Sequence, residues 1–358
     1  MITETCDALV IGAGPAGAVA ARVLASGGLR TVLVNSAAGI GPKVGESLPG
    51  AARTMLHSAG LLPWLERSSP QVNIGNLSSW GSAPLIATDF IFDPQGCGWH
   101  LDRTRFDQSL RAAAAESGAI LIEGRMRSLV SDASGMMVTL ADRQIRARWV
   151  IDASGKSRAV ARRMGARRWR ESTLIALYAW GKDLSTDSRS LVEAVADGWW
   201  YTAGLPGGLR VAALHSTPAQ AAAVLRNPEG FASAMAGSAH IRKYCTIDDT
   251  WSSVQSTDAT ASWLTQAHGP AWIAVGDAAI SFDPLSSQGI FNAIYTGLRG
   301  AQAILSSIRT GDSLQVMQYG VRLNDIRRAY RLQVADYYRQ EQRWPLHPFW
   351  RSRHEQQR

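Results

Sequence analysis

The sequence predicts an α/β fold with a parallel sheet built from both ends of the chain and an antiparallel sheet inserted between them. Residues 6–11 and 31–35 are short apolar runs without alternation, typical of buried parallel strands, with a helical pattern between them. Residues 272–276 form another such run, followed by a long helical pattern at 289–309. From about residue 170 to 262 alternating apolar and polar residues dominate, which favours antiparallel strands.

The composition is that of a globular protein with a basic surface. The chain has 358 residues, of which 46% are hydrophobic and 18% charged, and a formal net charge of +8, so it can bury a large core. Only Lys43, Lys156, Lys182 and Lys243 are lysines, and the arginines are scattered except for a dense group in 321–358. Because no nucleic-acid-binding motif accompanies this charge, no nucleic-acid partner is expected.

Cysteines, histidines and apolar runs argue against three other classes of protein. Cys6, Cys97 and Cys245 are odd in number and form no C-x-x-C pair, so neither a disulfide framework nor a zinc site is expected. The 7 histidines show no metal-ligand spacing, so no metal is expected. The N-terminus lacks a signal-peptide pattern, and no run approaches the roughly 18 apolar residues that cross a membrane. We therefore expect a cytoplasmic protein without a membrane partner.

The turn after the first strand carries the most specific motif. Gly12, Gly14 and Gly17 form a G-x-G-x-x-G pattern between a strand and a helix, the context in which it indicates dinucleotide binding. Gly12 permits the tight turn, Gly14 lets the backbone approach a pyrophosphate, and Gly17 lets helix and strand pack closely. Pro15 and Ala16 begin the helix, whose amides and positive dipole favour phosphates. The motif predicts a Rossmann-like domain with all five residues at its cofactor.

The end of the second strand departs from the usual pattern of such domains. An acidic residue commonly holds the ribose hydroxyls there, whereas this chain has Asn35. An amide can hydrogen-bond a hydroxyl, but without the strength of a charged acceptor. Asn35 is therefore predicted to contact the cofactor and to hold it less tightly than an acid.

The stretch 276–289, GDAAISFDPLSSQG, indicates which dinucleotide binds. A buried strand ending in Gly-Asp, followed by a loop and a helix, resembles the second FAD fingerprint of the flavoprotein monooxygenase superfamily. The resemblance implies that Asp277 holds the ribityl chain and that Pro284, Gly289 and Ile290 lie at the flavin ring. The amides of this helix start would also stabilise negative charge on a reduced flavin.

Two further segments resemble the same superfamily. HLDRTRFDQSL is similar to its helix in which an arginine, here Arg103, contacts the cofactor. VIDASGKSRAVARRMG is similar to its Asp-Ala-Ser/Thr-Gly segment, around Asp152 and Gly155. Together with the two glycine-rich turns, these segments predict FAD as the cofactor.

Candidate catalytic residues are few. In this superfamily the loop at 43–50 runs near the flavin, which would place Glu46 and Ser47 beside the ring, where cofactor positioning is the favoured role. Glu46 is also a candidate for proton transfer, as is His215, because the inserted sheet could bring it to the same pocket. No catalytic triad or carboxylate pair is evident, as expected where the flavin itself makes and breaks bonds.

The motifs GESLPG (45–50) and FDPLSSQG (282–289) resemble those of two subfamilies. One is the flavin-dependent halogenases, and the other contains monooxygenases that oxidise a partner protein's tryptophan during maturation of tryptophylquinone enzymes. Halogenases need a lysine after the first motif, but residues 44–155 contain none and Lys43 precedes the motif. Ser286 stands where tryptophan halogenases carry Glu, and WWYTAGLP lacks the spacing of their W-x-W-x-I-P signature. The sequence therefore favours a monooxygenase over a halogenase.

The C-terminal segment supports the same choice. YYRQEQRWPLHPFWRSR resembles the tail of the tryptophan-oxidising flavoproteins, although anchoring on the body of the protein is the expected job of its aromatic residues. The residues that carry this resemblance are Arg343, Trp344, Pro345, Phe349 and Trp350.

The resemblance implies an FAD-dependent monooxygenase. Reduced FAD would react with dioxygen to a C4a-hydroperoxide, which would oxygenate an electron-rich aromatic such as an indole, in a small molecule or in a partner protein's tryptophan. Electrons would come from NAD(P)H or from a flavin reductase. Two alternatives stay open: a flavin-dependent halogenase, and a flavin-binding maturation factor without turnover of its own.

The expected division of the chain follows from these motifs. We predict an FAD-binding domain of separate segments, a mainly antiparallel substrate domain inserted into it, and a helical C-terminal segment. The predicted bounds are 1–70, 98–168 and 264–310 for the FAD-binding domain, 71–97 and 169–263 for the substrate domain, and 311–358 for the C-terminal segment.

Overall fold

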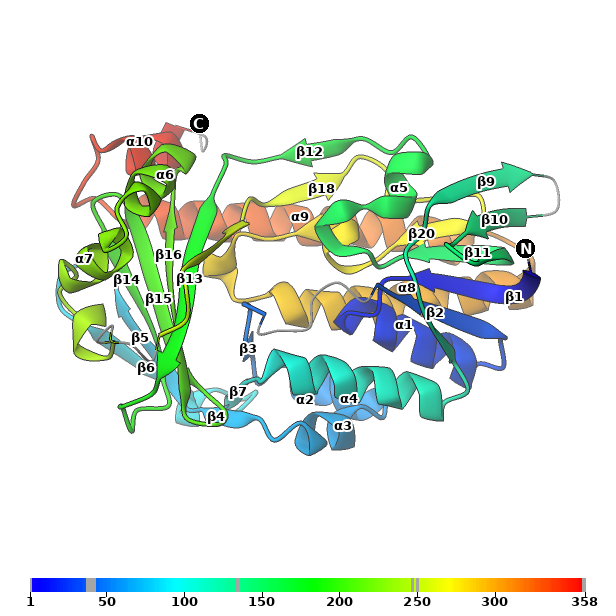
Figure 1. Cartoon of the computed structure of the whole chain (residues 1–358), viewed down its shortest axis with the longest axis horizontal. Helices are drawn as coiled ribbons and strands as arrows, with labels where there is room; N and C mark the ends of the chain where they lie inside the picture. Colours follow the sequence, from blue (N-terminus) through cyan, green and yellow to red (C-terminus); the bar gives the residue numbers. More distant parts are fainter. Residues whose placement is uncertain (1, 37–42, 133–134, 246–247, 249–250, 356–358) are drawn as a thin grey trace.

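A computed structural model describes residues 2–36, 43–132, 135–245, 248 and 251–355. It confirms the α/β class, with a mainly parallel sheet and a mainly antiparallel sheet at opposite ends of an elongated molecule (Figure 1). Residues 37–42, which directly precede the loop at 43–50, lie outside the described residues.

The parallel sheet has the strand order β19-β20-β11-β1-β2-β8, with β10 and β9 added at β11. Its central strands are buried on both faces, which explains their unbroken apolar runs. The strands are β1 Ile2–Ile11, β2 Thr31–Asn35, β8 Ile120–Glu123, β9 Ser128–Asp132, β10 Gly135–Thr139, β11 Arg143–Asp152, β19 His268–Gly269 and β20 Trp272–Ala274.

Register brings three strand ends to one edge of this sheet. Ile11 of β1 lies opposite Asp152 of β11, and Asp152 lies opposite Ala274 of β20. The glycine turn after β1, the turn after β11 and the turn after β20 are therefore neighbours, although the paired residues are 141 and 122 positions apart in the sequence. This carboxyl edge is where α/β sheets bind ligands.

The antiparallel sheet has the order β17-β13-β16-β15-β14-β5-β6, and only the β14–β5 pair is parallel. Alternation along β15 sends Trp199 toward one face and Trp200 toward the other, where Trp200 contacts Phe231 at 5.0 Å between ring centroids. The strands are β5 Gly75–Ser79, β6 Ile86–Asp89, β13 Ile175–Lys182, β14 Ser190–Val195, β15 Gly198–Leu205, β16 Leu209–Ser216 and β17 Gln255–Asp258.

Two small sheets join these larger units. One is formed by β3 Ser47–Leu48, β7 Gly98–His100 and β4 Gln71–Asn73, and the other by β12 Arg168–Arg170, β18 Ser262–Leu264 and β21 Ile280–Ser281. The second sheet pairs strands from both sides of the boundaries expected near residues 168 and 263. The division into three parts stays a prediction.

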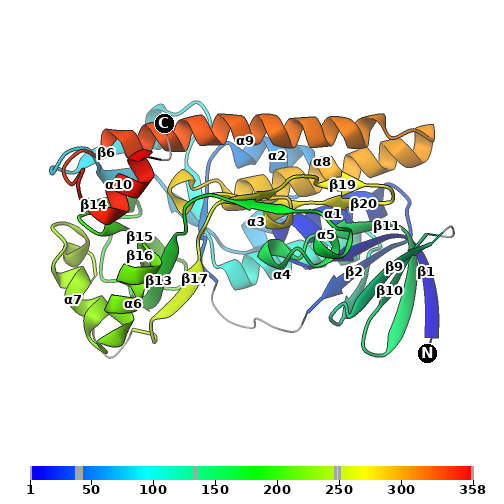
Figure 2. The ribbon, with the colours of Figure 1, turned by 90° about the horizontal axis from the view of Figure 1, so that it is seen from above.

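Most helices lie beside the parallel sheet, whereas α6 and α7 lie at the antiparallel sheet (Figure 1), and α9 runs along almost the whole molecule toward α10 (Figure 2). Asp102 caps α4 as the sequence indicates, because its Oδ1 accepts hydrogen bonds from the Thr104 and Arg105 amides at 2.9 and 3.0 Å. None of the described helices is long and apolar enough to cross a membrane. The helices are α1 Pro15–Ser26, α2 Ala52–Ser58, α3 Leu62–Arg67, α4 Arg103–Glu116, α5 Ala159–Arg163, α6 Pro218–Arg226, α7 Gly230–Ala236, α8 Gly289–Thr310, α9 Leu314–Gln340 and α10 Pro348–Glu355.

Close contact between α1 and α8 depends on a glycine. A Cβ atom added at Gly297 of α8 would lie 2.3 Å from the carbonyl oxygen of Ala16 in α1. No side chain can occupy that space without moving one helix, so the close packing of α8 on the start of α1 requires glycine at position 297.

We expect Gly297→Ala to lower the free energy of unfolding by about 1–3 kcal/mol, because the added methyl group must push α8 away from α1. Gly237→Ala is the matched control, since a Cβ there makes only ordinary contacts at 3.5 Å or more and should change stability by less than about 0.5 kcal/mol. Urea unfolding of both variants checks this. Equal stabilities would show that the helices do not need this approach.

Candidate active site

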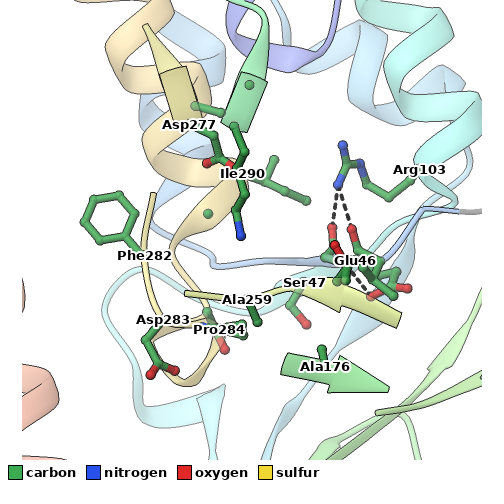
Figure 3. Close-up of a pocket in the computed structure, with 18 of the residues that line it drawn as sticks. Glu46, Ser47, Arg103, Ala176, Ala259, Asp277, Phe282, Asp283, Pro284 and Ile290 are labelled. Atoms are coloured by element: carbon green, nitrogen blue, oxygen red, sulfur yellow. Dashed lines mark hydrogen bonds between the residues drawn. The ribbon is translucent and has the colours of Figure 1, made fainter. Parts of the chain in front are cut away.

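A cavity of about 460 Å³ lies between the carboxyl edge of the parallel sheet and one face of the antiparallel sheet (Figure 3). Most residues that the sequence nominated meet there. Those lining it are Gly14, Pro15, Ala16, Glu46, Ser47, Arg103, His215, Asp277, Pro284, Gly289 and Ile290. Gly12, Gly17 and Asn35 do not line it.

Gly12 and Gly17 shape the turn behind the cavity. Gly12 has a φ of +107°, and a Cβ there would lie 2.3 Å from the Ala153 carbonyl oxygen. A Cβ at Gly17 would lie 1.9 Å from the Gly12 carbonyl oxygen. Both positions therefore require glycine, and they let α1 begin directly at the sheet edge. A contact of Asn35 with a cofactor stays a prediction.

Two helices point their N-termini at this cavity. Gly14 precedes α1 and Gly289 begins α8, and a Cβ at either glycine would meet no atom within 4 Å. Open space therefore lies beside the free amides of both helix starts. Free amides and the positive end of the helix dipole attract negatively charged groups such as phosphates.

Asp277 opens into the cavity from the turn after β20 (Figure 3). Among the described residues no donor bonds to its carboxylate, so its oxygens are available to a ligand. Burial raises the pKa of Asp277, while the nearby cations Lys156, Arg158 and Arg103 oppose this rise. A carboxylate placed in this way can accept hydrogen bonds from hydroxyl groups.

Arg103 fixes the loop that faces Asp277 across the cavity. Its Nη1 donates to the carbonyl oxygens of Val44 and Gly45 at 3.2 and 2.9 Å, and its Nε lies 3.1 Å from Asp107 Oδ1. Asp107 is buried and also binds Lys43 at 3.0 Å. Arg103 therefore holds the loop through backbone contacts while it lines the cavity.

Glu46 is a buried carboxyl group in the cavity wall. It is 3% exposed, accepts a hydrogen bond from the Gly45 amide at 2.8 Å and lies 3.4 Å from Trp180 Nε1. Burial raises its pKa from 4.5 to about 7, although the Arg103 charge opposes the rise. Glu46 therefore changes protonation near neutral pH, as a proton donor or acceptor should.

The antiparallel sheet lines the cavity with a face of aromatic and small side chains. Ser47 Oγ and Tyr201 Oη are 2.8 Å apart and link the loop to β15. Tyr201 lies opposite Ala213, and Trp199 lies opposite His215 in the register of β15 and β16. Together with Ala176, Val211 and Ala259, these residues make a cavity wall that is mostly apolar.

His215 reaches the cavity, as the sequence allowed, but as a neutral ring. It stacks on Trp199 with ring centroids 3.7 Å apart, and its buried Nδ1 has no hydrogen-bond partner among the described residues. Burial lowers its pKa to about 3. An imidazole that stays neutral at ordinary pH is a poor general acid. Its catalytic role stays a prediction, and its position suits contact with a flat ring.

The loop FDPLSSQG turns between β21 and α8, with Phe282, Pro284 and Ser287 lining the cavity. Its Asp283 accepts a hydrogen bond from the Leu285 amide at 3.0 Å and another from Tyr338 Oη at 2.8 Å. The Asp283 amide donates to Tyr330 Oη at 2.9 Å. Two tyrosines of α9 therefore fix the loop.

Lys156 is the residue that sequence reasoning missed. It lines the cavity, and its Nζ donates to the carbonyl oxygen of Asp258 on β17. Burial lowers its pKa, although Asp277 and Asp258 oppose the fall. Lys156 directly follows the lysine-free range 44–155. The turn after β11 brings Lys156 into the site from a different direction.

Asp152 serves the fold and does not line the cavity. Its Oδ2 accepts the amides of Val160 and Ala161 at 2.9 and 2.8 Å and so caps α5, while its Oδ1 accepts the Ser154 hydroxyl at 2.5 Å. The turn after it does reach the cavity, because Gly155 is among the lining residues. Among the described residues, no three His, Cys, Asp or Glu side chains gather as a metal site.

The cavity fits FAD on the chain's own geometry. Open space beside two helix N-termini suits a pyrophosphate and a flavin ring, and the Asp277 carboxylate, which no described residue bonds, suits a ribityl chain. Comparison with known proteins decides the family: residues 5–295 match the model of a family described as FAD binding domain. The chain belongs to this family. The protein is thus an FAD-dependent oxidoreductase of the monooxygenase type, as its motifs predicted.

Relatives of this flavoprotein include a putative FAD-dependent oxidoreductase LodB from Marinomonas mediterranea, 28% identical over 98% of this chain and 97% of the relative. Among solved structures, the peptidyl tryptophan dihydroxylase QhpG has a TM-score of 0.79 at 25% identity, covering 98% of this chain and 79% of its own. The myxobacterial chondrochloren halogenase CndH has a TM-score of 0.86 at 23% identity, covering 98% and 86%, a likeness of fold.

We expect Arg103→Met to weaken FAD binding roughly 10–100-fold, because the loss of charged hydrogen bonds worth about 1.5–3 kcal/mol frees the loop at Gly45. Titration of the apoprotein with FAD, followed by flavin fluorescence, measures the change. Arg105→Met is the control on the same helix, since the Arg105 side chain is 66% exposed. An unchanged affinity of Arg103→Met for FAD would contradict the role of Arg103 in FAD binding.

The raised pKa of Glu46 predicts a pH-dependent stability. The folded protein binds this proton more tightly than the unfolded chain, so this contribution is greatest below pH 4.5 and is lost as pH rises to about 7. Glu46→Gln removes this loss. The free energy of unfolding of the variant, minus that of the unmodified protein, should therefore be up to about 3 kcal/mol higher at pH 8 than at pH 4. Urea unfolding at both pH values measures this, with the exposed Glu66→Gln as control. If the difference in free energy of unfolding between the variant and the unmodified protein is the same at both pH values, the pKa of Glu46 is not raised.

Proposed function

We propose that the protein is a monooxygenase that inserts oxygen into an electron-rich aromatic ring, and that an indole is its substrate. The observation that carries this proposal is the mostly apolar wall of the cavity, in which Trp199, Tyr201 and His215 stand beside small side chains at Ala176 and Ala213. Rings pack well on such a wall, and small side chains leave room for a bicyclic one. Similarity to the peptidyl tryptophan dihydroxylase supports an indole borne by a peptide.

The protein's own groups have separate tasks in this proposal. FAD, when bound, accepts electrons from NAD(P)H or a flavin reductase and activates dioxygen. Gly14, Asp277 and the start of α8 hold it, and Arg103 keeps the loop of Glu46 in place. Glu46 holds or releases a proton at its carboxylate near neutral pH. The aromatic wall orients the ring and excludes water, which protects the reactive oxygen species.

The direct test reduces the holoenzyme without air, adds oxygen in the presence of indole or a tryptophan-containing peptide, and weighs the products. We expect a mass gain of one or two oxygen atoms. Replacing Ala213 by Phe should fill the wall and abolish product, while FAD binding remains. Holoenzyme that accepts electrons and consumes oxygen but leaves every indole unchanged would overturn the proposed substrate, and holoenzyme that cannot be reduced would favour a maturation factor without turnover.

Halogenation is the second candidate, and Lys156 is the observation that favours it. Its ammonium group in the cavity wall could receive hypohalous acid between flavin and substrate. The sequence alone did not place a lysine in this cavity. The same reaction run with bromide separates the two functions, because incorporation of bromine changes product mass differently from oxygen. Brominated product lost in Lys156→Met would establish halogenation, and oxygenated product in both proteins would exclude it.

A further inference from the structure

One row of cavity-lining side chains begins at the edge of the antiparallel sheet. Thr257 of β17 lies opposite Ala176 of β13. Ala176 lies opposite His215 of β16, which in turn lies opposite Trp199 of β15. All of them line the cavity. Residues directly opposite each other in neighbouring strands place their side chains on the same face of a sheet, so this row crosses the four strands on the cavity face.

Exposure increases along this row toward β17. Trp199 is 1% exposed, and His215 and Ala176 are 4% exposed, whereas Thr257 is half-buried and its neighbour Ser256 is exposed. β17 is the last strand of the sheet and, among the described residues, pairs only with β13. Figure 2 shows β17 at the side of this sheet, next to β13. The lining of the cavity therefore reaches solvent at this strand edge.

The backbone groups of β17 face β13 and the open edge in alternation. The Ala259 amide donates to the Leu174 carbonyl oxygen at 2.8 Å, so this residue bonds on the β13 side. The direction reverses at every residue of an antiparallel strand, so the backbone groups of Ser256 and Asp258 point away from β13. The Asp258 carbonyl oxygen agrees with this direction, because it accepts Nζ of Lys156 from a turn outside this sheet. The N–H and C=O of Ser256 and the N–H of Asp258 therefore face the open edge.

We propose that an extended segment of a peptide substrate binds as an additional antiparallel strand beside β17 and places a tryptophan side chain in the cavity. The tryptophan lies directly opposite Thr257, so its indole extends the lining row on the cavity face. The residue after the tryptophan exchanges two backbone hydrogen bonds with Ser256, and the residue before it accepts one from the Asp258 amide. This inference rests on the proposed oxygenation of an indole and adds how a peptide presents that ring.

The chemistry of the edge favours a peptide over other occupants. A strand added to a free sheet edge gains affinity from main-chain hydrogen bonds and specificity from pockets that receive alternate side chains. Here the edge and the pocket belong to the same register, because Thr257 is part of both. A second copy of β17 would offer Gln255 and Thr257 on this face, and neither side chain is a ring that fills an aromatic-lined cavity.

The first test measures binding of a short, fluorescently labelled, threonine-rich peptide with one central tryptophan to oxidised holoenzyme with bound FAD. Methylation of the backbone nitrogen of the residue after the tryptophan removes the donor to the Ser256 carbonyl oxygen, so the affinity should fall at least about 10-fold. Methylation of the tryptophan's own backbone nitrogen is the matched control, because that N–H points away from β17. It should change the affinity by less than about 2-fold. Equal effects of the two methyl groups would overturn the proposal.

Two proline substitutions test the edge from the side of the protein. Ser256→Pro removes the outward N–H of β17 and keeps the hydrogen bonds to β13, so it should weaken peptide binding roughly 5–10-fold. Ala87→Pro is the matched control on β6, the opposite edge of the same sheet. The Phe90 amide bonds to the Ile74 carbonyl oxygen of the adjoining chain, so by the same alternation the Ala87 amide points outward. This control should leave peptide binding unchanged. FAD content and thermal unfolding verify that both variants are folded.

The results separate this inference from the proposed function. If unmodified holoenzyme oxygenates free indole but does not bind the peptide, or binds it equally well after Ser256→Pro, the edge is not the peptide site. A dimer of the unmodified protein that Ser256→Pro dissociates would assign the edge to a second copy and would also overturn the inference. If the peptide binds with the expected alternation but no indole is oxygenated, the proposed function fails and the binding edge stands.

Discussion

The close approach of backbone to backbone at the start of α1 is the constraint on which the site depends. Gly17 lies against the Gly12 carbonyl, and Gly297 of α8 lies against the Ala16 carbonyl, with no room for a Cβ at either glycine. These contacts bring the N-terminus of α1 to the sheet edge and the N-terminus of α8 beside it. Two helix starts in one cavity provide amides for an anionic cofactor without any charged side chain.

The cavity has two chemically different sides because two sheets supply them. The parallel sheet edge offers turns, helix N-termini and the charged groups Asp277 and Lys156. The antiparallel sheet offers rings and small side chains from alternate positions of its strands. Burial raises the pKa of Glu46 and lowers that of His215, so the groups nearest the apolar side favour their neutral forms. Such a division suits a polar cofactor and a flat, apolar substrate.

Local patterns foretold the parts of this molecule that local chemistry determines. The glycine turns, the cap at Asp102 and the buried strands follow from short-range sequence rules, whereas the places of Asp277 and Arg103 in the cavity were implied by the family resemblance of their segments. The sequence did not foretell Lys156, or the hydrogen bond between Ser47 and Tyr201 across 154 residues. Those contacts depend on strand register and on how two sheets face each other, which no local pattern encodes.

The hydrogen bonds from α9 to the loop after β21 have a further consequence for the newborn chain. Tyr330 and Tyr338 reach Asp283 from 47 and 55 residues downstream. While the ribosome has made the glycine turns and both sheets but not α9, the loop between β21 and α8 lacks these anchors. This side of the cavity therefore gains its last anchors only when almost the whole chain has been synthesised.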